Sequence, residues 1–216
     1  MLKEAVPTLT QISEQKRRAN RRNIYLDGKF AFGCNVNVVA KFKLREGMTL
    51  TESQVTDIQL GEVKQDCFDH ALKLLERRLH SRDELSRKLT RMEFGPVVVN
   101  EALQDLTRLG YIDDARFART KALAAAEHKQ HGKRRAMVEL MKSGVKGDVA
   151  RKALADVYDD RDTLSVARKL AEKQAPRLRK LDPQVARRRL VGMLQRRGFD
   201  YEDIQPVIEQ VLGRGE

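Results

Sequence analysis

The chain contains an internal repeat, and this repeat limits its possible folds more than any other feature. In the segment 81–114 the apolar residues recur at helical spacing, with one break at Gly95-Pro96, where a second helix can begin. The apolar positions of this helix pair are Leu85, Leu89, Phe94, Val98, Val99, Ala102, Leu103 and Leu106. The same pattern returns 51 and 105 residues later, and in the third copy only Asp203 departs from it. Chance amphipathicity does not explain such agreement, so the chain is predicted to consist mainly of repeated helices.

A further amphipathic segment precedes each helix pair, which makes the repeating unit three helices long. These leading helices are expected at 67–79, 115–129 and 163–174. We therefore predict a mainly α fold, in which three tandem three-helix repeats form an elongated curved array behind a small α+β module with a β-hairpin. The predicted boundaries are 1–62 for the α+β module, 63–113 for repeat one, 114–159 for repeat two and 160–216 for repeat three. Repeat three has a longer spacing, so Pro176 and residues 177–180 are interpreted as an inserted linker.

Helix start and stop signals recur together with the repeats. Ser81 and Glu84 form a capping box, and Asp182-Pro183 is expected to open the second helix of repeat three. The glycines expected just beyond helix ends are Gly110, Gly144 and Gly198. The acidic residues expected to cap helices are Asp113 or Asp114, Asp148 and Asp200.

The first 60 or so residues have a different pattern, typical of a small α+β module. Asp27-Gly28 lies between two short β-prone runs, which predicts a two-residue hairpin turn. We expect strands near 8–15, 23–26 and 29–32, a helix at 36–42 and another from Thr51 to about Leu60. The basic run between the first two strands contains Lys16, Arg17, Arg18, Arg21 and Arg22. It is either a solvated loop or an arm that contacts phosphate, and we favour the arm.

Composition bears mainly on the partners of the chain. Charged residues make up 34% of the 216 residues and the formal net charge is +12, so polyanions or acidic protein faces are the expected partners. The excess is uneven, because segment 65–113 has 8 basic and 9 acidic residues whereas segment 114–159 has 11 and 6. An anionic partner is therefore expected along repeats two and three.

Several kinds of site are not expected. Cys34 and Cys67 are too few and too isolated for a disulfide framework or a zinc site, and no acidic or thiol cluster accompanies His128 and His131. The glycines are single rather than grouped in a phosphate-binding loop, and no paired acids or bases indicate catalysis. We therefore predict a non-enzymatic protein without cofactor or metal. With no apolar run that could span a membrane and no signal peptide, the chain is expected in the cytoplasm.

Basic residues occupy two positions of the second helix in every repeat. The equivalent residues are Arg82, Lys133 and Arg187 near the start of that helix, and Arg91, Lys142 and Arg196 near its end. A cation near a helix end complements the helix dipole, whereas a cation near the start does not and suggests a partner. Solvated charge is the alternative throughout. The residues predicted to contact an anionic partner are Arg82, Lys133, Arg134, Arg135, Lys142, Arg187, Arg188, Arg189, Arg196 and Arg197.

The three-helix unit could also be a helix-turn-helix DNA reader. Such a reader needs side chains that reach base edges, and the third helices, PVVVNEALQDL and GDVARKALADV, offer few of them. Non-specific contact with phosphate is therefore favoured over sequence reading.

Two segments carry motifs of a known kind. Residues 81–89, SRDELSRKL, fit the pattern S-x-x-E-L-x-x-K-L, and residues 106–118, LTRLGYIDDARFA, fit L-x-x-L-G-Y-I-D-D-x-R-F-A. In both, the chain resembles the RecX family of bacterial regulatory proteins. The three-unit layout extends the resemblance to about Leu212, although repeat three is unusually rich in arginine.

The resemblance implies a modulator of the RecA recombinase that lies in the groove of the RecA filament on DNA. Such a protein impedes ATP hydrolysis and strand exchange in DNA repair, and it damps the co-protease activity that starts the SOS response. Its expected partners are the RecA filament and, without sequence preference, single- and double-stranded DNA, and we expect it to act as a monomer. The alternative is a free-standing non-specific DNA-binding protein or a transcriptional repressor that competes for DNA.

Overall fold

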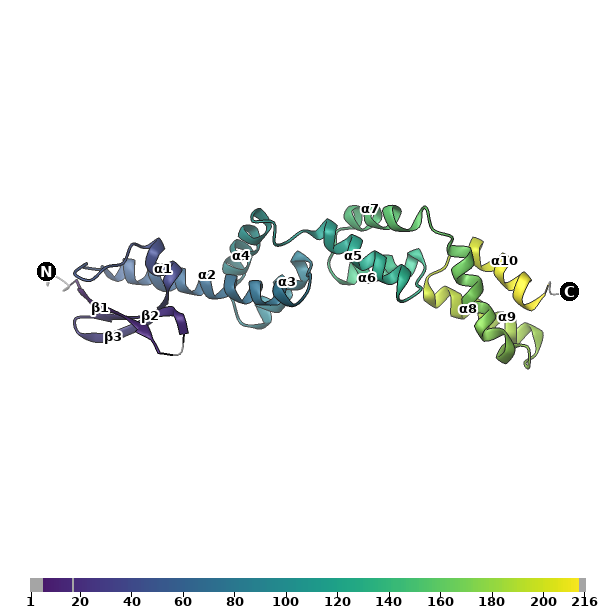
Figure 1. Ribbon diagram of the computed structural model, residues 1–216, viewed down its shortest axis with the longest axis horizontal. Coiled ribbons are helices and arrows are strands. Elements are labelled where there is room, and N and C mark those ends of the chain that lie inside the picture. The colour runs from purple at the N-terminus through teal and green to yellow at the C-terminus, as the bar shows by residue number, and fades with distance from the viewer. Residues whose placement is uncertain (1–5, 17, 214–216) are drawn as a thin grey trace. The chain divides into compact units, whose positions relative to one another are not determined.

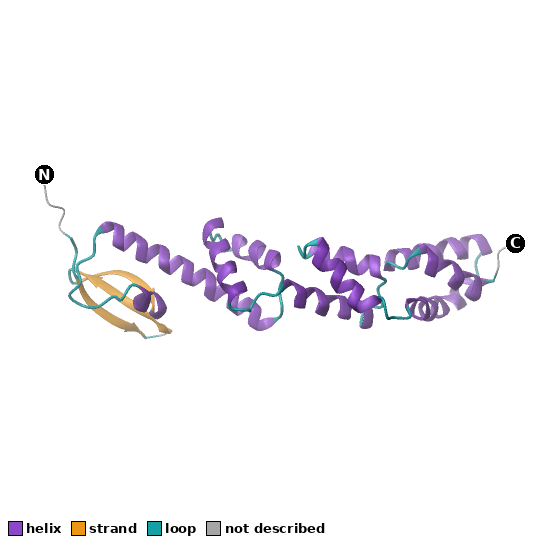
Figure 2. Ribbon diagram, turned by 90° about the horizontal axis from the view of Figure 1, so that it is seen from above, coloured by secondary structure: helices purple, strands orange, loops and turns teal. Residues whose placement is uncertain are grey.

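The computed structural model describes residues 6–16 and 18–213, and the chain forms two units (Figure 1). The first unit comprises residues 1–78 and 85–111, and the second comprises residues 79–84 and 112–216. Strands occur at the start of the first unit, and helices make up the rest of the regular structure in the described ranges (Figure 2). The prediction of a mainly helical chain behind a small α+β module is therefore confirmed.

The first unit begins with an antiparallel sheet of three strands in the order β1-β2-β3. The strands are β1 (Leu9–Gln15), β2 (Arg18–Leu26) and β3 (Lys29–Asn35). Asp27 and Gly28 have φ angles of 49° and 78°, as the predicted two-residue turn requires. Helices α1 (Val36–Lys41) and α2 (Glu52–Arg77) cover one face of this sheet (Figure 1). The core between them contains Leu9, Ile24, Cys34, Val38, Leu44, Leu50 and Ile58.

Helix α2 departs from the expected pattern of two separate helices. It begins at the capping box of Thr51 and Gln54 and continues for 26 residues, through the expected end near Leu60 and across the predicted boundary between residues 62 and 63. Gly61 does not end it, because this glycine is a packing position: a Cβ there would lie 2.7 Å from the ring of Phe42. The absence of a side chain at Gly61 therefore lets α2 pack closely against Phe42, and it does not end the helix.

Strand β2 begins earlier than expected, so most of the basic run belongs to a strand. Arg18, Arg21 and Arg22 are strand residues, and Arg22 is the cross-strand partner of Glu14. Lys16 lies in the turn, and Arg17 lies outside the described residues. The expected start of this strand at Asn23 was wrong, because cross-strand pairing with β1 begins at Arg18.

Two further helices complete the first unit, α3 (Arg82–Arg91) from Leu85 onward and α4 (Pro96–Arg108). Pro96 occupies the first turn of α4, and Gly110 follows its end with a φ of 78°, both as predicted. The buried residues of these helices are Leu85, Leu89, Val98, Val99, Ala102, Leu103 and Leu106. All seven belong to the apolar pattern from which the repeat was inferred.

The second unit holds two three-helix bundles. They consist of α5 (Asp114–Glu127), α6 (Lys133–Lys142) and α7 (Gly147–Tyr158), followed by α8 (Thr163–Leu178), α9 (Pro183–Arg197) and α10 (Tyr201–Leu212). Each bundle has its own core, one centred on Leu140 and Leu154 and one on Leu190 and Leu194. Asp203, the one polar residue in the repeated pattern, accepts a hydrogen bond of 3.2 Å from the hydroxyl of Thr163.

Two local predictions in the second unit were wrong. Pro176 lies inside α8, which continues to Leu178, so the segment interpreted as a linker is partly helical. One proline in a last, exposed turn removes a single backbone hydrogen bond, which water can replace. Asp148 is in the first turn of α7 but does not cap it, since the cap position is Lys146. Asp200 has the predicted cap position without a capping hydrogen bond.

Both cysteines are buried free thiols. Burial, reinforced by the charge of Glu62, raises the pKa of Cys34 to about 12, and burial raises the pKa of Cys67 to about 11. We expect neither thiol to react with a disulfide reagent at about pH 8 in the folded protein, and both to react in denaturant, because the thiolate is the nucleophile. Rapid labelling of either cysteine without denaturant, detected by mass spectrometry, would contradict this prediction.

Candidate anion-binding surface

The second unit contains a junction where the end of α9 meets the start of α6. The backbone N–H groups of Gly132 and Arg134 donate to the carbonyl groups of Arg197 and Gly198, at 2.8 and 3.2 Å. The Arg197 guanidinium donates to the Lys129 carbonyl at 3.2 Å. A helix start has unpaired N–H groups and a helix end has unpaired carbonyl groups, so each end satisfies the other.

A similar arrangement occurs at the end of α6. The Ser81 hydroxyl donates to the Ser143 carbonyl, and a Cβ on Gly144 would overlap the Asp83 side chain. Gly144 and Gly198 are equivalent in the repeat and have φ angles of 75° and 86°. Two of the three predicted helix-ending glycines, Gly144 and Gly198, are thus also positions of close contact between neighbouring three-helix segments, whereas Gly110 is not.

The basic residues at the start of α6 lie at this junction and have acidic neighbours. Lys133 Nζ is 2.7 Å from an Asp159 oxygen, and Arg134 Nε is 2.6 Å from an Asp200 oxygen. These side chains are largely exposed, so each pair adds little stability, about 0–1 kcal/mol. The pairs nevertheless offset the positive charge that an anion would meet, and the Arg134 pair explains why Asp200 does not cap α10.

Arg135 belongs to a second charged group, centred on Glu139. Arg135 Nε lies 3.7 Å from a Glu139 oxygen, Lys129 Nζ lies at 2.8 Å and His131 Nδ1 at 3.2 Å. Burial alone would raise the pKa of Glu139, but the hydrogen bond and charge of Lys129, with the charges of His131 and Arg135, lower it. Burial has the largest effect on the pKa of His131 and lowers it. Glu139 opposes this effect, and the charges of Lys129, Arg135 and Arg197 reinforce it.

The lowered pKa of His131 predicts a loss of stability in mild acid. Because the folded state favours neutral His131, the unfolded chain binds more protons below about pH 6.5, and stability falls as the pH falls. We expect the unfolding temperature to drop between about pH 7.5 and about pH 5.5, and the His131→Asn variant to drop less. His128→Asn, which removes an exposed histidine, is the control. Equal pH slopes for His131→Asn and wild type would contradict the prediction.

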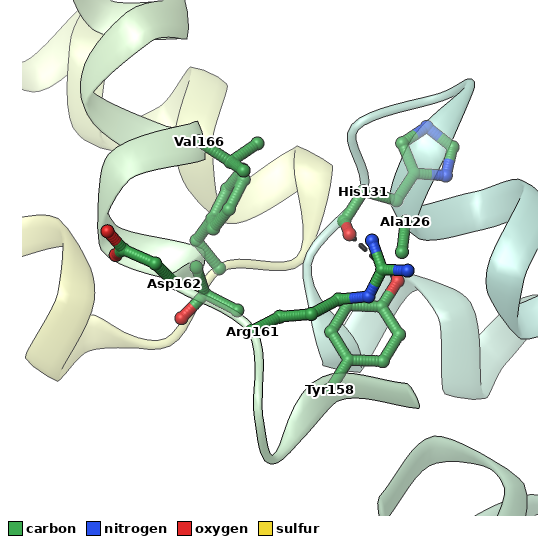
Figure 3. A pocket seen from close by; sticks show the side chains of 8 residues that line it. Ala126, His131, Tyr158, Arg161, Asp162 and Val166 are labelled. Atoms are coloured by element: carbon green, nitrogen blue, oxygen red, sulfur yellow. Dashed lines mark hydrogen bonds between the residues drawn. The ribbon is translucent and has the colours of Figure 1, made fainter. Parts of the chain in front are cut away.

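A small pocket lies next to the junction and shows how repeats two and three meet (Figure 3). The Tyr158 hydroxyl donates to the His131 carbonyl at 2.9 Å, and Arg161 pairs with Glu127 at 2.7 Å. Burial raises the pKa of Tyr158 to about 12, so the hydroxyl keeps its proton and remains a donor at neutral pH. With Phe199 and Val166 as apolar lining, the pocket is a packing contact and lacks a nucleophile beside a base.

The arginines of α9 differ from the basic residues of α6. Ala186, Leu190 and Leu194 of α9 are buried, which turns the remaining faces of the helix outward. Within the described part of the chain, no ion pair or hydrogen bond engages the side chains of Arg187, Arg188, Arg189 and Arg196. A groove of about 390 Å³ runs along α8 and α9 and is lined by Gln174, Leu178, Arg188, Arg189, Leu190, Met193 and Arg196.

The equivalence of Arg82, Lys133 and Arg187 extends only partly to their helical positions. Arg82 and Lys133 are the first residues of α3 and α6, and the Arg82 N–H donates to Asp114 at 2.8 Å. Helix α9, however, begins at Pro183, so Arg187 lies beyond its first turn. The argument from an unfavourable helix dipole therefore does not apply to repeat three. Lys142 ends α6, as predicted.

In the first unit, Arg21 and Arg22 are held within the protein. Arg21 contacts Glu62 at 2.8 Å and Asp66 at 3.2 Å, and Arg22 contacts Glu14 at 3.1 Å. Arg21 thereby links the sheet to α2. Lys16 and Arg18 are exposed, with no ion pair in the ranges that the structure describes.

Sequence reasoning missed the acidic partners Asp159 and Asp200. They lie 26 and 66 residues from the cations that they contact, and nothing in the local pattern distinguishes them from other acids near helix ends.

Residues 6–16 and 18–213 contain no group of three or more His, Cys, Asp or Glu side chains suited to a metal ion. None of the described helices has both the length and the apolar character to span a membrane.

Family models match three parts of the chain. The regulatory protein RecX N-terminal domain matches residues 7–51, the first three-helix domain of RecX matches 67–106, and the third matches 160–208. The regulatory protein RecX of Bacillus subtilis (strain 168) is 31% identical over 208 residues, which cover 95% of this chain and 78% of that protein. RecX of Leuconostoc mesenteroides is 28% identical, with coverages of 94% and 76%.

Solved structures agree on the fold. A crystal structure of regulatory protein RecX has a TM-score of 0.82 at 24% identity and covers 94% of this chain and 99% of its own. RecX from Lactobacillus salivarius has a TM-score of 0.63 at 22% identity, with coverages of 70% and 97%. The resemblance carried by the motifs at 81–89 and 106–118 thus holds across nearly the whole chain, and the chain belongs to the RecX family of regulatory proteins.

Proposed function

We propose that the protein binds the filament that the RecA recombinase forms on DNA and inhibits its recombinase, ATPase and co-protease activities. Membership of a regulatory family over 95% of the chain supports this, as does the net charge of +12. The observation that carries the proposal is the set of exposed arginines on α9, Arg188, Arg189 and Arg196, which have no acidic partner in the described residues. Unpaired guanidinium groups in a groove suit phosphate or acidic side chains.

The two repeats of the second unit contribute unequally to this contact. The basic residues of repeat two have internal acidic partners, so an anion has to displace Asp159 or Asp200 before Lys133 or Arg134 can bind it. The arginines of repeat three have no such competition. The contact surface is therefore centred on α9, with α6 in a secondary role.

The direct test measures ATP hydrolysis by purified RecA on single-stranded DNA with increasing amounts of the protein. We expect the rate to fall to a plateau as the filament is occupied. Unchanged hydrolysis at a large excess of the protein would refute the proposal. If the loss of hydrolysis only equals the loss of DNA that the protein itself binds and withholds from RecA, the free-standing DNA-binding alternative holds instead.

Removal of the internal acids should strengthen anion binding. In an Asp159→Asn/Asp200→Asn variant, Lys133 and Arg134 lose their partners, so we expect tighter binding to DNA and a salt slope steeper by about 1–2. Fluorescence anisotropy of a labelled duplex measures both. Asp156→Asn/Asp160→Asn, which also removes two negative charges but at exposed positions without an ion pair in the described part of the chain, is the control. Equal gains in the control would show that only net charge matters.

A further inference from the structure

In the described residues of the first unit, α1 and α2 cover one face of the sheet, and no helix of this unit covers the other face. Ile24 and its cross-strand partners Ile12 and Phe32 face the core with α1 and α2. Side chains alternate along β2, so Tyr25 and Asn23 point away from the core that Ile24 faces. Register shifts between Leu9 and Gln11 and between Ile24 and Tyr25 bring Gln11 and Phe30 into the row of Tyr25. The residues in the rows of Tyr25 and Asn23, which we call the aromatic face, are Gln11, Tyr25 and Phe30, followed by Ser13, Asn23 and Gly33.

Aromatic rings on this face are available for contact. Phe30 is 59% exposed, although the chain has few aromatic residues and its core does not use this one. The Tyr25 ring lies beside it, edge to face, with 5.9 Å between ring centroids. A cross-strand aromatic pair stabilises a hairpin, but that role does not require the face of one ring to be open to solvent. The exposed ring provides a flat apolar surface for a ligand.

The remaining groups of the aromatic face are uncharged and can form hydrogen bonds. Gln11 is exposed, and the Asn23 side chain accepts a hydrogen bond of 2.9 Å from Gln15, which leaves its own amide N–H groups available. Gly33 contributes no side chain, and the Gln15 amide lies over it, since a Cβ there would lie 2.8 Å from Gln15 Nε2. The two rows contain no carboxylate.

The border of the face is positively charged. Lys16, Arg18 and Lys29 are exposed and have no acidic partner within residues 6–16 and 18–213. The nearby acids are already engaged, since Asp27 accepts a hydrogen bond from the Thr8 N–H and Glu14 pairs with Arg22. A ligand on this face therefore meets aromatic rings and amides at the centre and unpaired cations at the edge.

We propose that the aromatic face binds single-stranded nucleic acid. Unpaired bases stack on Phe30 and Tyr25, amides of Gln11 and Asn23 contact base edges, and the border cations contact phosphates. A double helix is excluded from this mode, because its bases are already stacked on one another and cannot reach a flat sheet. Stacking accepts any base, so the site has little sequence preference. The inference does not rest on the proposed function, because binding here requires no RecA.

The chain has no tryptophan, which gives a specific optical test. In a Phe30→Trp variant of the full chain, the single indole reports stacking at this site. We expect saturable quenching by an oligo(dT) of about 10 nucleotides, within the site sizes of such proteins, and none by inorganic polyphosphate, which has charge but no bases. No quenching by oligo(dT), or equal quenching by polyphosphate, would overturn the proposal.

Affinity gives the second test. Phe30→Ala should weaken oligo(dT) binding about tenfold, in the range that loss of one stacked base produces. The matched control is Tyr201→Ala, which removes an aromatic side chain that is 61% exposed on α10. Circular dichroism verifies folding, and Phe30→Leu replaces Phe30→Ala if that variant is unstable. If both Phe30 variants bind like wild type, the face serves a protein partner or none, and the proposal fails. Inhibition of RecA is measured separately, so either proposal can fail alone.

Discussion

The Gly198→Ala variant is expected to lose about 3 kcal/mol of stability in the second unit, the sum of two effects. The φ of 86° is a left-handed conformation that costs an alanine about 1 kcal/mol or more. The added Cβ would also overlap the backbone of Arg135, which adds about 1–3 kcal/mol for overpacking. The helix ends cannot move apart without breaking the hydrogen bonds from Gly132 and Arg134.

Two further glycines separate these effects. Gly110 follows α4 with a φ of 78° and has no atom within 4 Å of a Cβ, so Gly110→Ala measures backbone strain alone. Gly132 has an ordinary φ of −72°, but its Cβ would overlap the Gly198 carbonyl, so Gly132→Ala measures the overlap alone. Thermal unfolding followed by circular dichroism, with hydrogen exchange to locate the loss, tests the three variants. If Gly198→Ala and Gly110→Ala lose the same stability, the junction is not tightly packed.

Replacement of Arg188, Arg189 and Arg196 together by alanine is expected to cause the largest loss of anion binding. Neutralised phosphates release about 0.9 counterions each, so three lost contacts reduce the salt slope on duplex DNA by about 2–3. Binding near physiological salt should fall by about tenfold or more. The matched triple Lys133, Arg134 and Arg135 to alanine should cost less, because acids already offset those charges.

The comparison of the two triple variants decides where the surface lies. Both remove three cations from exposed positions of a second helix, so net charge changes equally. Anisotropy of labelled DNA across a salt series and inhibition of RecA ATPase are measured for each. An equal or larger loss in the α6 triple would place the surface on repeat two. If inhibition survives in the α9 triple while DNA binding is lost, contact with the RecA protein carries the regulation.

Local signals predicted the elements of the fold well. The hairpin at Asp27-Gly28, the start of α9 at Asp182-Pro183 and the end at Gly198 depend on backbone preferences of a few adjacent residues. The predictions failed where packing overrides such preferences. Gly61 lies within a long helix against Phe42, and Pro176 is tolerated in the last turn of α8.

The candidate surface could be predicted only in part. The equivalence of the basic positions could be predicted from the sequence, because the repeats share one helical register. The sequence did not predict which cations remain available to an anion, since Lys133 and Arg134 contact acidic residues 26 and 66 positions away. The open aromatic face also requires the strand register, which a one-residue shift would reverse.

The amino-acid sequence by itself determined the three-helix repeat, most helix ends and the excess of positive charge, because these follow from spacing and composition along the chain. The tertiary structure decided which basic residues have an acidic partner and which have none in the described residues. An ion pair forms where two oppositely charged side chains come within about 4 Å, however far apart they are in the sequence. The tertiary structure likewise decided that Gly144 and Gly198 are contact points between repeats, since only packing places Asp83 and Arg135 against them.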